Sequence, residues 1–382
     1  MLVIDSLLGG GTERSLADLL TCYPSRNVEP LVIALRQSGS EGFEEEVIRS
    51  GVIVLFSPPG SPFAQITWLR KLIRNHKPDL VHTMLAKADM IGRVAAWRTG
   101  VPLLCSLVIV PYEKERLKER NLSRWKVRLW QLMDIITSAF LVDHFHAVSE
   151  SVKEGAVRRL RLAPEKITVV RRGRNEEKIG QPSPERKIEA RRVLGLGRED
   201  IVLLNVGRCH YQKGQQYLLE AVSMLAPRWD RLRLLIAGRA GNASQELEAF
   251  TKSLGLNGRV SFLGHQREVT TLLTAADIFV FPSLYEGLPG AVIEAMALGL
   301  PIIASDIGPV RELAEEGKNA LLVPLRSSGA LSEAIERLML EPRMRENFGK
   351  RSREIFLERF RLAASADDMV KLYRKVTENE GA

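Results

Sequence analysis

The sequence predicts an α/β protein built from two doubly wound domains, each with a parallel sheet. The chain of 382 residues is longer than one compact core requires. Short apolar, β-branched segments alternate with longer amphipathic segments in both halves, which is typical of parallel strands connected by helices. The alternation stops once, at about 171–200, where a polar segment with two prolines predicts a linker.

Each predicted strand is a short apolar segment. The amino-terminal segment predicts a first strand and its turn rather than a signal peptide, because it lacks a basic leader and reaches glycine after eight residues. Doubly wound sheets bind ligands beyond the carboxyl ends of their strands, so polar residues that directly follow a strand are candidate site residues. The further predicted strands are 30–35, 79–84, 101–110, 144–149, 201–207, 233–238, 259–264, 278–283, 301–305 and 320–324.

The charge balance predicts an anionic partner. The chain has 55 basic and 46 acidic residues, a net charge of +9, which suits a nucleotide phosphate, an acidic membrane surface or nucleic acid. No basic stripe belongs to a known nucleic-acid module, so we expect no nucleic-acid partner. Cys22, Cys105 and Cys209 lack metal-ligand spacing and are typical of a reducing compartment. No apolar run is long enough to cross a bilayer, so we expect a cytoplasmic protein.

A glycine-rich turn near the start of the chain is the first candidate anion site. Residues 7–20 read LLGGGTERSLADLL, a strand, three glycines and a helix. Glycine lets a backbone approach an anion closely, and the start of a helix attracts it. Because the spacing G-x-G-x-x-G is absent, a plain turn explains this segment equally well.

A basic segment at 112–134 leaves two interpretations open. It contains seven Lys and Arg residues with interleaved apolar side chains, namely Trp125, Leu129, Trp130, Leu132 and Met133. A helix of this kind can lie on an anionic membrane, where tryptophan suits the interface. Alternatively, its apolar stripe packs on the sheet and its charges are solvated.

The segment NVGRCHYQKG, residues 205–214, is the first candidate site in the second half. A strand ends in glycine, and Arg208 and Lys213 follow before a helix, which suits a clamp for a diphosphate. The alternative is a solvated basic loop. No Gly-Lys-Ser/Thr follows, so this is not a Walker loop.

The segment FVFPSLYEGLPG, residues 279–290, ends the next candidate strand and leads into a helix. We expect the helix to begin near Pro289 and to end at Gly299. The backbone N–H groups of Gly290 and Ala291 would then be free to bind a phosphate.

Two glutamates frame this helix start. Glu294 lies about one turn inside the helix, where it can accept hydrogen bonds from sugar hydroxyls, and Glu286 can reach another part of the same ligand from the preceding loop. The alternative is a carboxylate favoured by the helix dipole and a second one on a solvated face. The apolar neighbours of Glu294 on all sides disfavour a solvated face.

These motifs resemble the family 4 retaining glycosyltransferases of the GT-B fold. The resemblance rests on GRCHYQKG, SLYEGLPGAVIEAMALGLPIIASDIGPVREL and LLGGGTERSLADL, and the two glutamates match the E-x7-E signature. Residues 146–154 resemble the last strand and helix of the family's first domain, and residues 359–376 resemble its final helix. The likeness therefore covers nearly the whole chain. It implies two Rossmann-like domains that face each other across a cleft: an acceptor-side domain at 1–178, a donor-side domain at 179–355 and a helix at 356–382 that crosses back to the first domain.

The resemblance also implies roles for the candidate residues. Glu294 would bind the ribose of a nucleotide sugar, and Glu286 would bind the donor sugar. The side chains of Arg208 and Lys213 would neutralise the diphosphate. The backbone N–H groups of Gly290, Ala291 and Gly11 would also bind it. Glu286, Arg208 and Lys213 are therefore the expected catalytic residues. The chain lacks Asp-x-Asp and supplies two cations, so we expect that neither a metal nor a cofactor is required.

The first domain departs from the family pattern at two places. Val108 occupies the position where the family often has a histidine, and Arg172-Gly173 replaces the usual Asn-Gly. His82 ends the preceding strand and either faces the cleft or is a packed or surface residue.

The predicted function is that of a retaining glycosyltransferase in bacterial-type glycan, glycolipid or polysaccharide biosynthesis. We expect a nucleotide-diphosphate sugar donor, a glycan or lipid-linked acceptor hydroxyl and peripheral contact with the inner face of an anionic membrane. Two alternatives remain, a GT-B-fold nucleotide-sugar epimerase and a non-catalytic nucleotide-sugar-binding protein. The missing dinucleotide fingerprint disfavours an oxidoreductase.

Overall fold

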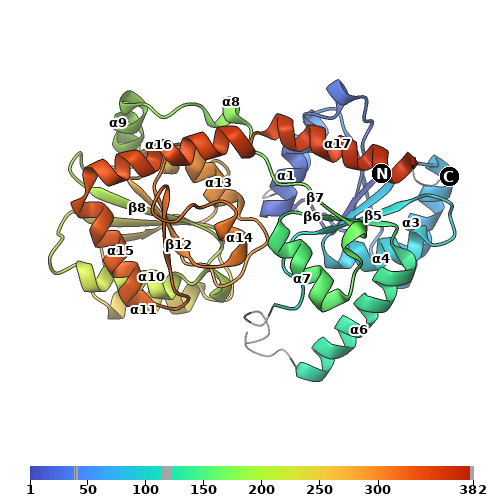
Figure 1. The fold of residues 1–382 in the computed structure, drawn as a ribbon, viewed down its shortest axis with the longest axis horizontal. Coiled ribbons are helices and arrows are strands. Elements are labelled where there is room, and N and C mark those ends of the chain that lie inside the picture. Colours follow the sequence, from blue (N-terminus) through green and yellow to red (C-terminus); the bar gives the residue numbers. More distant parts are fainter. Residues whose placement is uncertain (38, 40–41, 114, 116–122, 379–382) are drawn as a thin grey trace. The chain divides into compact units, whose positions relative to one another are not determined.

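The computed structural model describes residues 1–37, 39, 42–113, 115 and 123–378. The chain divides into two compact units, Met1–Gly173 with Leu362–Ala382 and Arg174–Arg361 (Figure 1). The sequence analysis placed the domain boundaries at 178/179 and 355/356, whereas the chain passes between the units directly before Arg174 and directly after Arg361.

The first unit contains a parallel sheet of seven described strands in the order β3-β2-β1-β4-β5-β6-β7. The order reverses between β1 and β4, which makes their carboxyl ends the switch point of this sheet. The sequence analysis did not predict β3 and β7, which form the two edges of the sheet. The strands are β1 (Leu2–Ile4), β2 (Leu31–Ala34), β3 (Ile53–Phe56), β4 (Val81–Met84), β5 (Leu103–Leu107), β6 (His144–Ala147) and β7 (Ile167–Val169).

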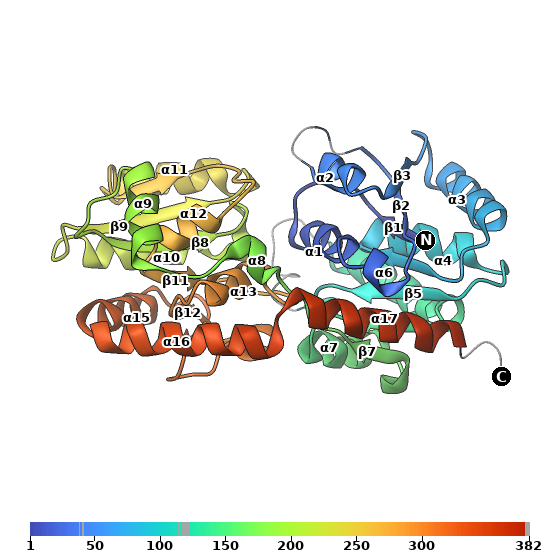
Figure 2. The ribbon, with the colours of Figure 1, turned by 90° about the horizontal axis from the view of Figure 1, so that it is seen from above.

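Helices cover both faces of this sheet (Figures 1 and 2). Their starts follow local sequence signals: Ser61 caps α3 directly before Pro62, and Ser149 caps α7. The helices are α1 (Gly11–Leu20), η1 (Pro24–Arg26), α2 (Glu44–Arg49), α3 (Pro62–His76), α4 (Ala86–Ala96), α6 (Arg124–Leu141), α7 (Glu150–Leu160), η3 (Pro164–Lys166) and α17 (Leu362–Glu378).

The last helix, α17, is part of the core of the first unit. Its apolar face, which includes Met369, Leu372 and Val376, packs with residues of α1, β1 and β2 in one buried cluster. Figure 2 shows α17 beside α1. The first and last segments of the chain are therefore built into the same unit.

The second unit contains a parallel sheet of six described strands in the order β10-β9-β8-β11-β12-β13. All six coincide with predicted strands to within a few residues. The order reverses between β8 and β11, so the switch point of this sheet lies at their carboxyl ends. The strands are β8 (Ile201–Val206), β9 (Leu232–Ala237), β10 (Val260–Phe262), β11 (Ile278–Phe281), β12 (Ile302–Ser305) and β13 (Ala320–Val323).

The chain passes from the first unit to the second between Gly173 and Arg174, inside the predicted linker at 171–200, but most of that segment is not a linker. Helices α8 and α9 lie there, capped by Asn175 and Ser183, and belong to this unit. Their sequence is polar, but α9 is anchored because Arg191 pairs with Asp277 at 2.6 Å. The helices are α8 (Glu176–Ile179), α9 (Pro184–Val193), η4 (Tyr211–Lys213), α10 (Gln215–Leu225), α11 (Ser244–Ser253), α12 (Thr270–Ala275), α13 (Gly290–Ala297), α14 (Gly308–Arg311), α15 (Ser328–Leu340) and α16 (Pro342–Arg359).

The basic segment predicted as one helix at 112–134 differs in the structure. Helix α6 begins at Arg124 and continues to Leu141, beyond the predicted end. Residues 114 and 116–122, in the first half of that prediction, lie outside the described part of the chain.

Candidate functional site

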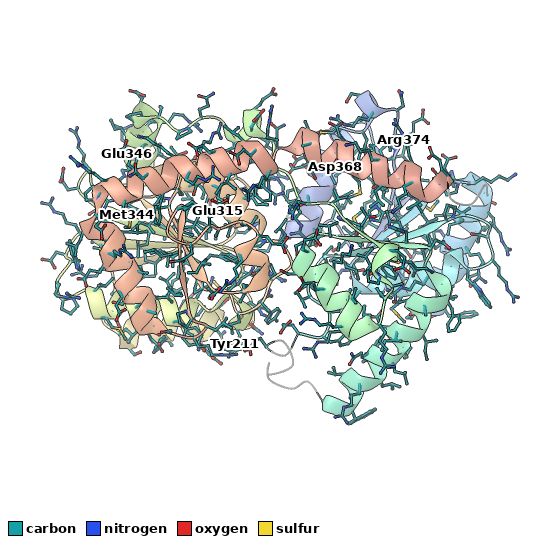
Figure 3. The ribbon with its side chains drawn as sticks, viewed as in Figure 1. Tyr211, Glu315, Met344, Glu346, Asp368 and Arg374 are labelled. Carbon is teal, nitrogen blue, oxygen red and sulfur yellow. The ribbon has the colours of Figure 1, made fainter. Side chains whose placement is uncertain are left out.

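The candidate site lies at the switch point of the second unit, where the loops after β8 and β11 meet. The loop after β8 contains the short turn η4, which begins at Tyr211 (Figure 3). Gln212 joins the two loops: its backbone oxygen accepts from the N–H of Leu284 at 2.8 Å, and its side chain donates to the carbonyl of Tyr285 at 2.7 Å. The two candidate segments of the sequence are thus held side by side.

Gly214 makes this close approach possible. Its φ angle is +62°, and a Cβ atom at this position would lie 2.1 Å from the carbonyl oxygen of Pro282. A larger residue would therefore clash with the neighbouring loop and would also be strained in its backbone. Glycine at this position lets Lys213, the preceding residue, lie directly beside the loop after β11.

Lys213 and Glu286 form an ion pair. The Nζ of Lys213 donates to Oε1 of Glu286 at 2.6 Å, and the two side chains are 15% and 11% exposed. The same Nζ lies 5.2 Å from the ring centroid of Phe281, so the ammonium group is held on two sides. The structure therefore brings together a cation predicted to bind the diphosphate and a carboxylate predicted to bind the donor sugar.

The amino terminus of α13 presents unpaired backbone donors next to these loops. Pro289 is the N-cap residue and provides no side-chain cap. Within the described part of the chain, the N–H groups of Gly290 and Ala291 have no hydrogen-bond partner. The same holds for the hydroxyl group of Ser283, which is fully buried two residues after the end of β11. Because the start of a helix attracts negative charge, this arrangement suits an anion such as a phosphate.

Glu294 pairs with a residue that the sequence analysis did not select. The Nε of Arg174 donates to Oε1 of Glu294 at 2.6 Å, and the two side chains are 3% and 16% exposed. Glu294 is therefore not on a solvated face, and that alternative is wrong. Arg174 directly follows the Arg172-Gly173 pair that departs from the family pattern, which was the available signal.

Arg208 lies outside these pairs. Its side chain is exposed directly after β8, and no described residue forms a hydrogen bond or an ion pair with it. This position suits both the predicted contact with a diphosphate and the solvated basic loop. The role of Arg208 remains a prediction.

Gly11 belongs to the first unit. It begins α1 beyond the carboxyl end of β1, at the switch point of the first sheet, with Gly10 as the N-cap residue. A Cβ atom at Gly11 would lie 3.2 Å from Nη1 of Arg172, which also donates through Nη2 to the hydroxyl of Thr12 at 3.1 Å. The start of α1 thus has a guanidinium beside it, and a role of Gly11 in donor binding remains a prediction.

The two positions singled out on the acceptor side do not form a catalytic group. His82 is buried and bonded to the hydroxyls of Tyr373 and Ser106 at 2.9 and 2.7 Å, so it packs in the core. Val108 directly follows β5 and is half-buried.

The outer face of α6 is apolar. The exposed side chains Trp125, Leu129, Leu132, Met133, Ile136 and Phe140 recur at helical spacing, and Phe140 is 81% exposed. The inner face is polar: Asp134 pairs with Arg93, and Gln131 donates to the carbonyl of Arg159 at 2.8 Å. The interpretation in which the apolar stripe packs on the sheet is therefore wrong.

This orientation is the reverse of an ordinary surface helix, which buries its apolar face. The exposed cations Lys126 and Arg128 flank the stripe, and the amino-terminal end of α6 extends beyond the rest of the unit (Figure 1). An apolar stripe with flanking cations suits an anionic interface.

Among the described residues, no group of three His, Cys, Asp or Glu side chains could hold a metal ion. No described helix is both long enough and apolar enough to cross a bilayer.

Both halves of the chain match family models. Residues 9–178 match the model described as Glycosyltransferase Family 4, and residues 186–355 match the model described as Glycosyl transferases group 1.

Two relatives act on lipid-linked substrates according to their names. The chain is 27% identical over 319 residues to the UDP-Gal:alpha-D-GlcNAc-diphosphoundecaprenol alpha-1,3-galactosyltransferase of Escherichia coli, a match that covers 82% of this chain and 79% of the relative. It is 28% identical over 318 residues to the N,N'-diacetylbacillosaminyl-diphospho-undecaprenol alpha-1,3-N-acetylgalactosaminyltransferase of Campylobacter jejuni, which covers 82% and 81% of the two chains.

The fold is similar to that of a solved structure. The structure of Anabaena HepE in complex with UDP-glucose superposes with a TM-score of 0.86 at 20% identity, covering 98% of this chain and 99% of that chain. At this identity the likeness concerns the fold.

Proposed function

The chain belongs to the family 4 glycosyltransferases of the GT-B fold, and we propose that it transfers a sugar from a nucleotide-diphosphate sugar to a hydroxyl group of a lipid-linked glycan. Its enzyme class is that of a retaining glycosyltransferase in glycan or polysaccharide biosynthesis. The donor site, the donor's base and the acceptor are the parts that we propose.

One observation carries the donor site. At the switch point of the second sheet, two carboxylates each have their own cation, and the free N–H groups of Gly290 and Ala291 begin the helix that joins them. Glu294 lies inside α13 and binds the ribose, because its carboxylate can accept hydrogen bonds from the ribose hydroxyls. Glu286 binds the transferred sugar, and Lys213 beside it binds the diphosphate. The bond between the sugar and the diphosphate, which breaks in the reaction, therefore lies beside the Lys213–Glu286 ion pair.

The chemistry follows from this arrangement. As the bond between the sugar and the diphosphate breaks, negative charge develops on the leaving group, and Lys213, Arg208 and the start of α13 stabilise it. The acceptor hydroxyl attacks the same face of the sugar that the diphosphate leaves, and its proton passes to the departing diphosphate. Glu286 stabilises the positive charge that forms on the sugar ring in between.

A screen of nucleotide diphosphates tests the donor site. Ligands that bind the native state raise its melting temperature, so UDP and UDP-glucose should raise the melting temperature of this chain. We choose uridine nucleotides first because the names of similar proteins contain them. If none of the common nucleoside diphosphates or their sugars stabilises the chain, the proposed donor site is wrong.

The outer face of α6 supports a lipid-linked acceptor. Its apolar stripe and flanking cations suit a surface of anionic lipid, which would bring the enzyme to an acceptor anchored in that surface. Two similar proteins carry diphosphoundecaprenol in their names. Turnover of the donor with a lipid-linked acceptor, and none with the same glycan free in solution, would support this proposal. Equal turnover with both would contradict it.

A further inference from the structure

Arg174 lies beside the proposed donor site although it is distant from it in sequence. Its Nε contacts Oε1 of Glu294, 120 positions further along the chain. Its Nη2 lies against the first residue of α13, since a Cβ atom built on Gly290 would be 2.0 Å from it. The guanidinium thus occupies the space that a side chain at Gly290 would need.

The backbone of Arg174 is also held in place. Its N–H donates to the carbonyl of Phe360 at 2.9 Å, and it forms an isolated parallel bridge with Arg361. Phe360 is fully buried. Both ends of this side chain are therefore fixed, which is the condition for orienting a partner group.

We propose that Arg174 is a positioning residue for the nucleotide sugar, because its guanidinium orients the Glu294 carboxylate toward the ribose. This inference rests on the proposed function, in which Glu294 binds ribose. One carboxylate oxygen, Oε1, is occupied by Arg174, while Oε2 has no partner among the described residues. Oε2 is therefore the oxygen that accepts from the ribose hydroxyls.

Because the Arg174–Glu294 pair is mostly buried, the Glu294 carboxylate depends on Arg174 for its charge and its orientation. A carboxylate that is mostly removed from water is unfavourable without a compensating charge, and Arg174 is itself nearly fully buried. When the guanidinium is removed, the carboxylate loses its fixed rotamer and its ionised form loses its partner. Arg174 then acts on the ligand through Glu294.

Calorimetry with UDP and UDP-glucose on the full chain tests this inference. Arg174→Met keeps the length of the side chain but removes its charge, and should weaken both ligands roughly tenfold or more, as expected for a charged hydrogen bond. Arg174→Lys should recover part of the affinity, since it restores the charge. In the Glu294→Gln background, Arg174→Met should cause little further loss, because residues that act through one contact are not additive.

A matched control separates positioning from folding. Arg191→Met breaks another partly buried pair of the same unit, in which Arg191 contacts Asp277 at 2.6 Å, and should lower the melting temperature without changing nucleotide affinity. If Arg174→Met does not fold, Gly290→Ala provides the same test, because its methyl group would displace the guanidinium.

The outcomes distinguish the inference from the proposed function. Unchanged affinity in a folded Arg174→Met variant overturns the inference alone, as does an equal loss in the wild-type and Glu294→Gln backgrounds. If the wild-type chain binds neither nucleotide, the proposed donor site fails and the inference fails with it.

Discussion

Lys213 and Arg208 are the two cations assigned to the diphosphate, and their surroundings differ. Lys213 is 15% exposed and paired, whereas Arg208 is exposed. Lys213→Ala should weaken nucleotide-diphosphate binding by roughly tenfold or more, since a charged hydrogen bond is worth about 1.5–3 kcal/mol. It should also lower the melting temperature, because Glu286 would remain without its partner. Calorimetry and thermal unfolding measure the two effects.

Arg208→Ala should weaken the same ligand without changing the melting temperature. An exposed side chain with no partner among the described residues contributes little to folding. Unchanged affinity in both variants would remove the cation clamp and leave Arg208 as part of a solvated loop.

The two glutamates should separate ribose binding from catalysis. Glu294→Gln should weaken UDP and UDP-glucose by similar factors, because both ligands contain ribose. Glu286→Gln should leave UDP affinity nearly intact and lower the turnover rate, because its contact with the sugar tightens as positive charge develops. Affinities and turnover are measured for both variants.

Melting temperatures serve as the control for this pair, since each glutamate has a cationic partner within the protein. The reverse pattern, with UDP binding lost in Glu286→Gln and retained in Glu294→Gln, would exchange the two roles. If neither variant changes binding or turnover, this segment is only the start of a helix.

At the scale of a single element, α6 carries the prediction about membranes. The variant with Trp125→Gln and Trp130→Gln should sediment less with anionic vesicles than the wild-type chain, because Trp125 belongs to the apolar stripe and Trp130 is exposed on the same helix. Wild-type binding should also decrease from low to physiological salt, since screening weakens the attraction to lipid charge.

Trp97 provides a matched control for α6. It is 48% exposed at the end of α4, outside the stripe, so Trp97→Gln should leave vesicle binding unchanged. If the wild-type chain sediments with neither neutral nor anionic vesicles, the stripe does not bind lipid.

A buried row of hydrogen bonds connects α17 to the sheet of the first unit, and so joins distant parts of the chain. The carbonyl of Val170 can only accept, so Nε2 of His146, at 2.9 Å, carries the hydrogen. Nδ1 of His146 then accepts from Ser106 at 2.8 Å, and Ser106 accepts from Nε2 of His82 at 2.7 Å. His82 in turn accepts from Tyr373 at 2.9 Å. Each bond thus fixes the direction of the next, with both histidines neutral.

This row predicts how stability depends on pH. Burial lowers the pKa of His146 from 6.5 to about 4 and lowers that of His82 well below its ordinary value. Between about pH 4 and pH 6.5, His146 is protonated in the unfolded chain but neutral in the folded chain, so the unfolded chain binds more protons through it. The histidine contribution to the free energy of unfolding should therefore be complete above about pH 6.5 and should decrease as the pH falls toward about 4.

A difference between variants isolates this contribution. Burial raises the pKa of Asp89 to about 7, which opposes the histidine effect, so the slope of the wild-type chain alone is not diagnostic. His146→Gln removes one titrating group and should flatten the dependence of stability on pH in this window. Tyr373→Phe breaks one bond of the row without removing a group that titrates in this window, and should lower stability at every pH in it with little change in slope. Equal slopes in all three proteins would contradict the prediction.

Residue type and local spacing were sufficient for much of the fold and for the segments that meet at the proposed donor site. Apolar segments between polar turns predicted eleven strands, because a strand buried in a parallel sheet needs a continuous run of apolar residues. The glycine, cations and glutamates that follow β8 and β11 were predicted as site residues, because ligands bind at the carboxyl ends of such strands.

Contacts between distant segments depended on the three-dimensional arrangement. The pairing of Arg174 with Glu294 spans 120 positions, and no local pattern encodes it. The apolar residues of α6 predicted a stripe, but periodicity does not state whether a stripe faces the core or the solvent. That depends on the polar partners offered by neighbouring elements, here Arg93 and the carbonyl of Arg159, which hold the polar face of α6 against the unit and leave its apolar face exposed.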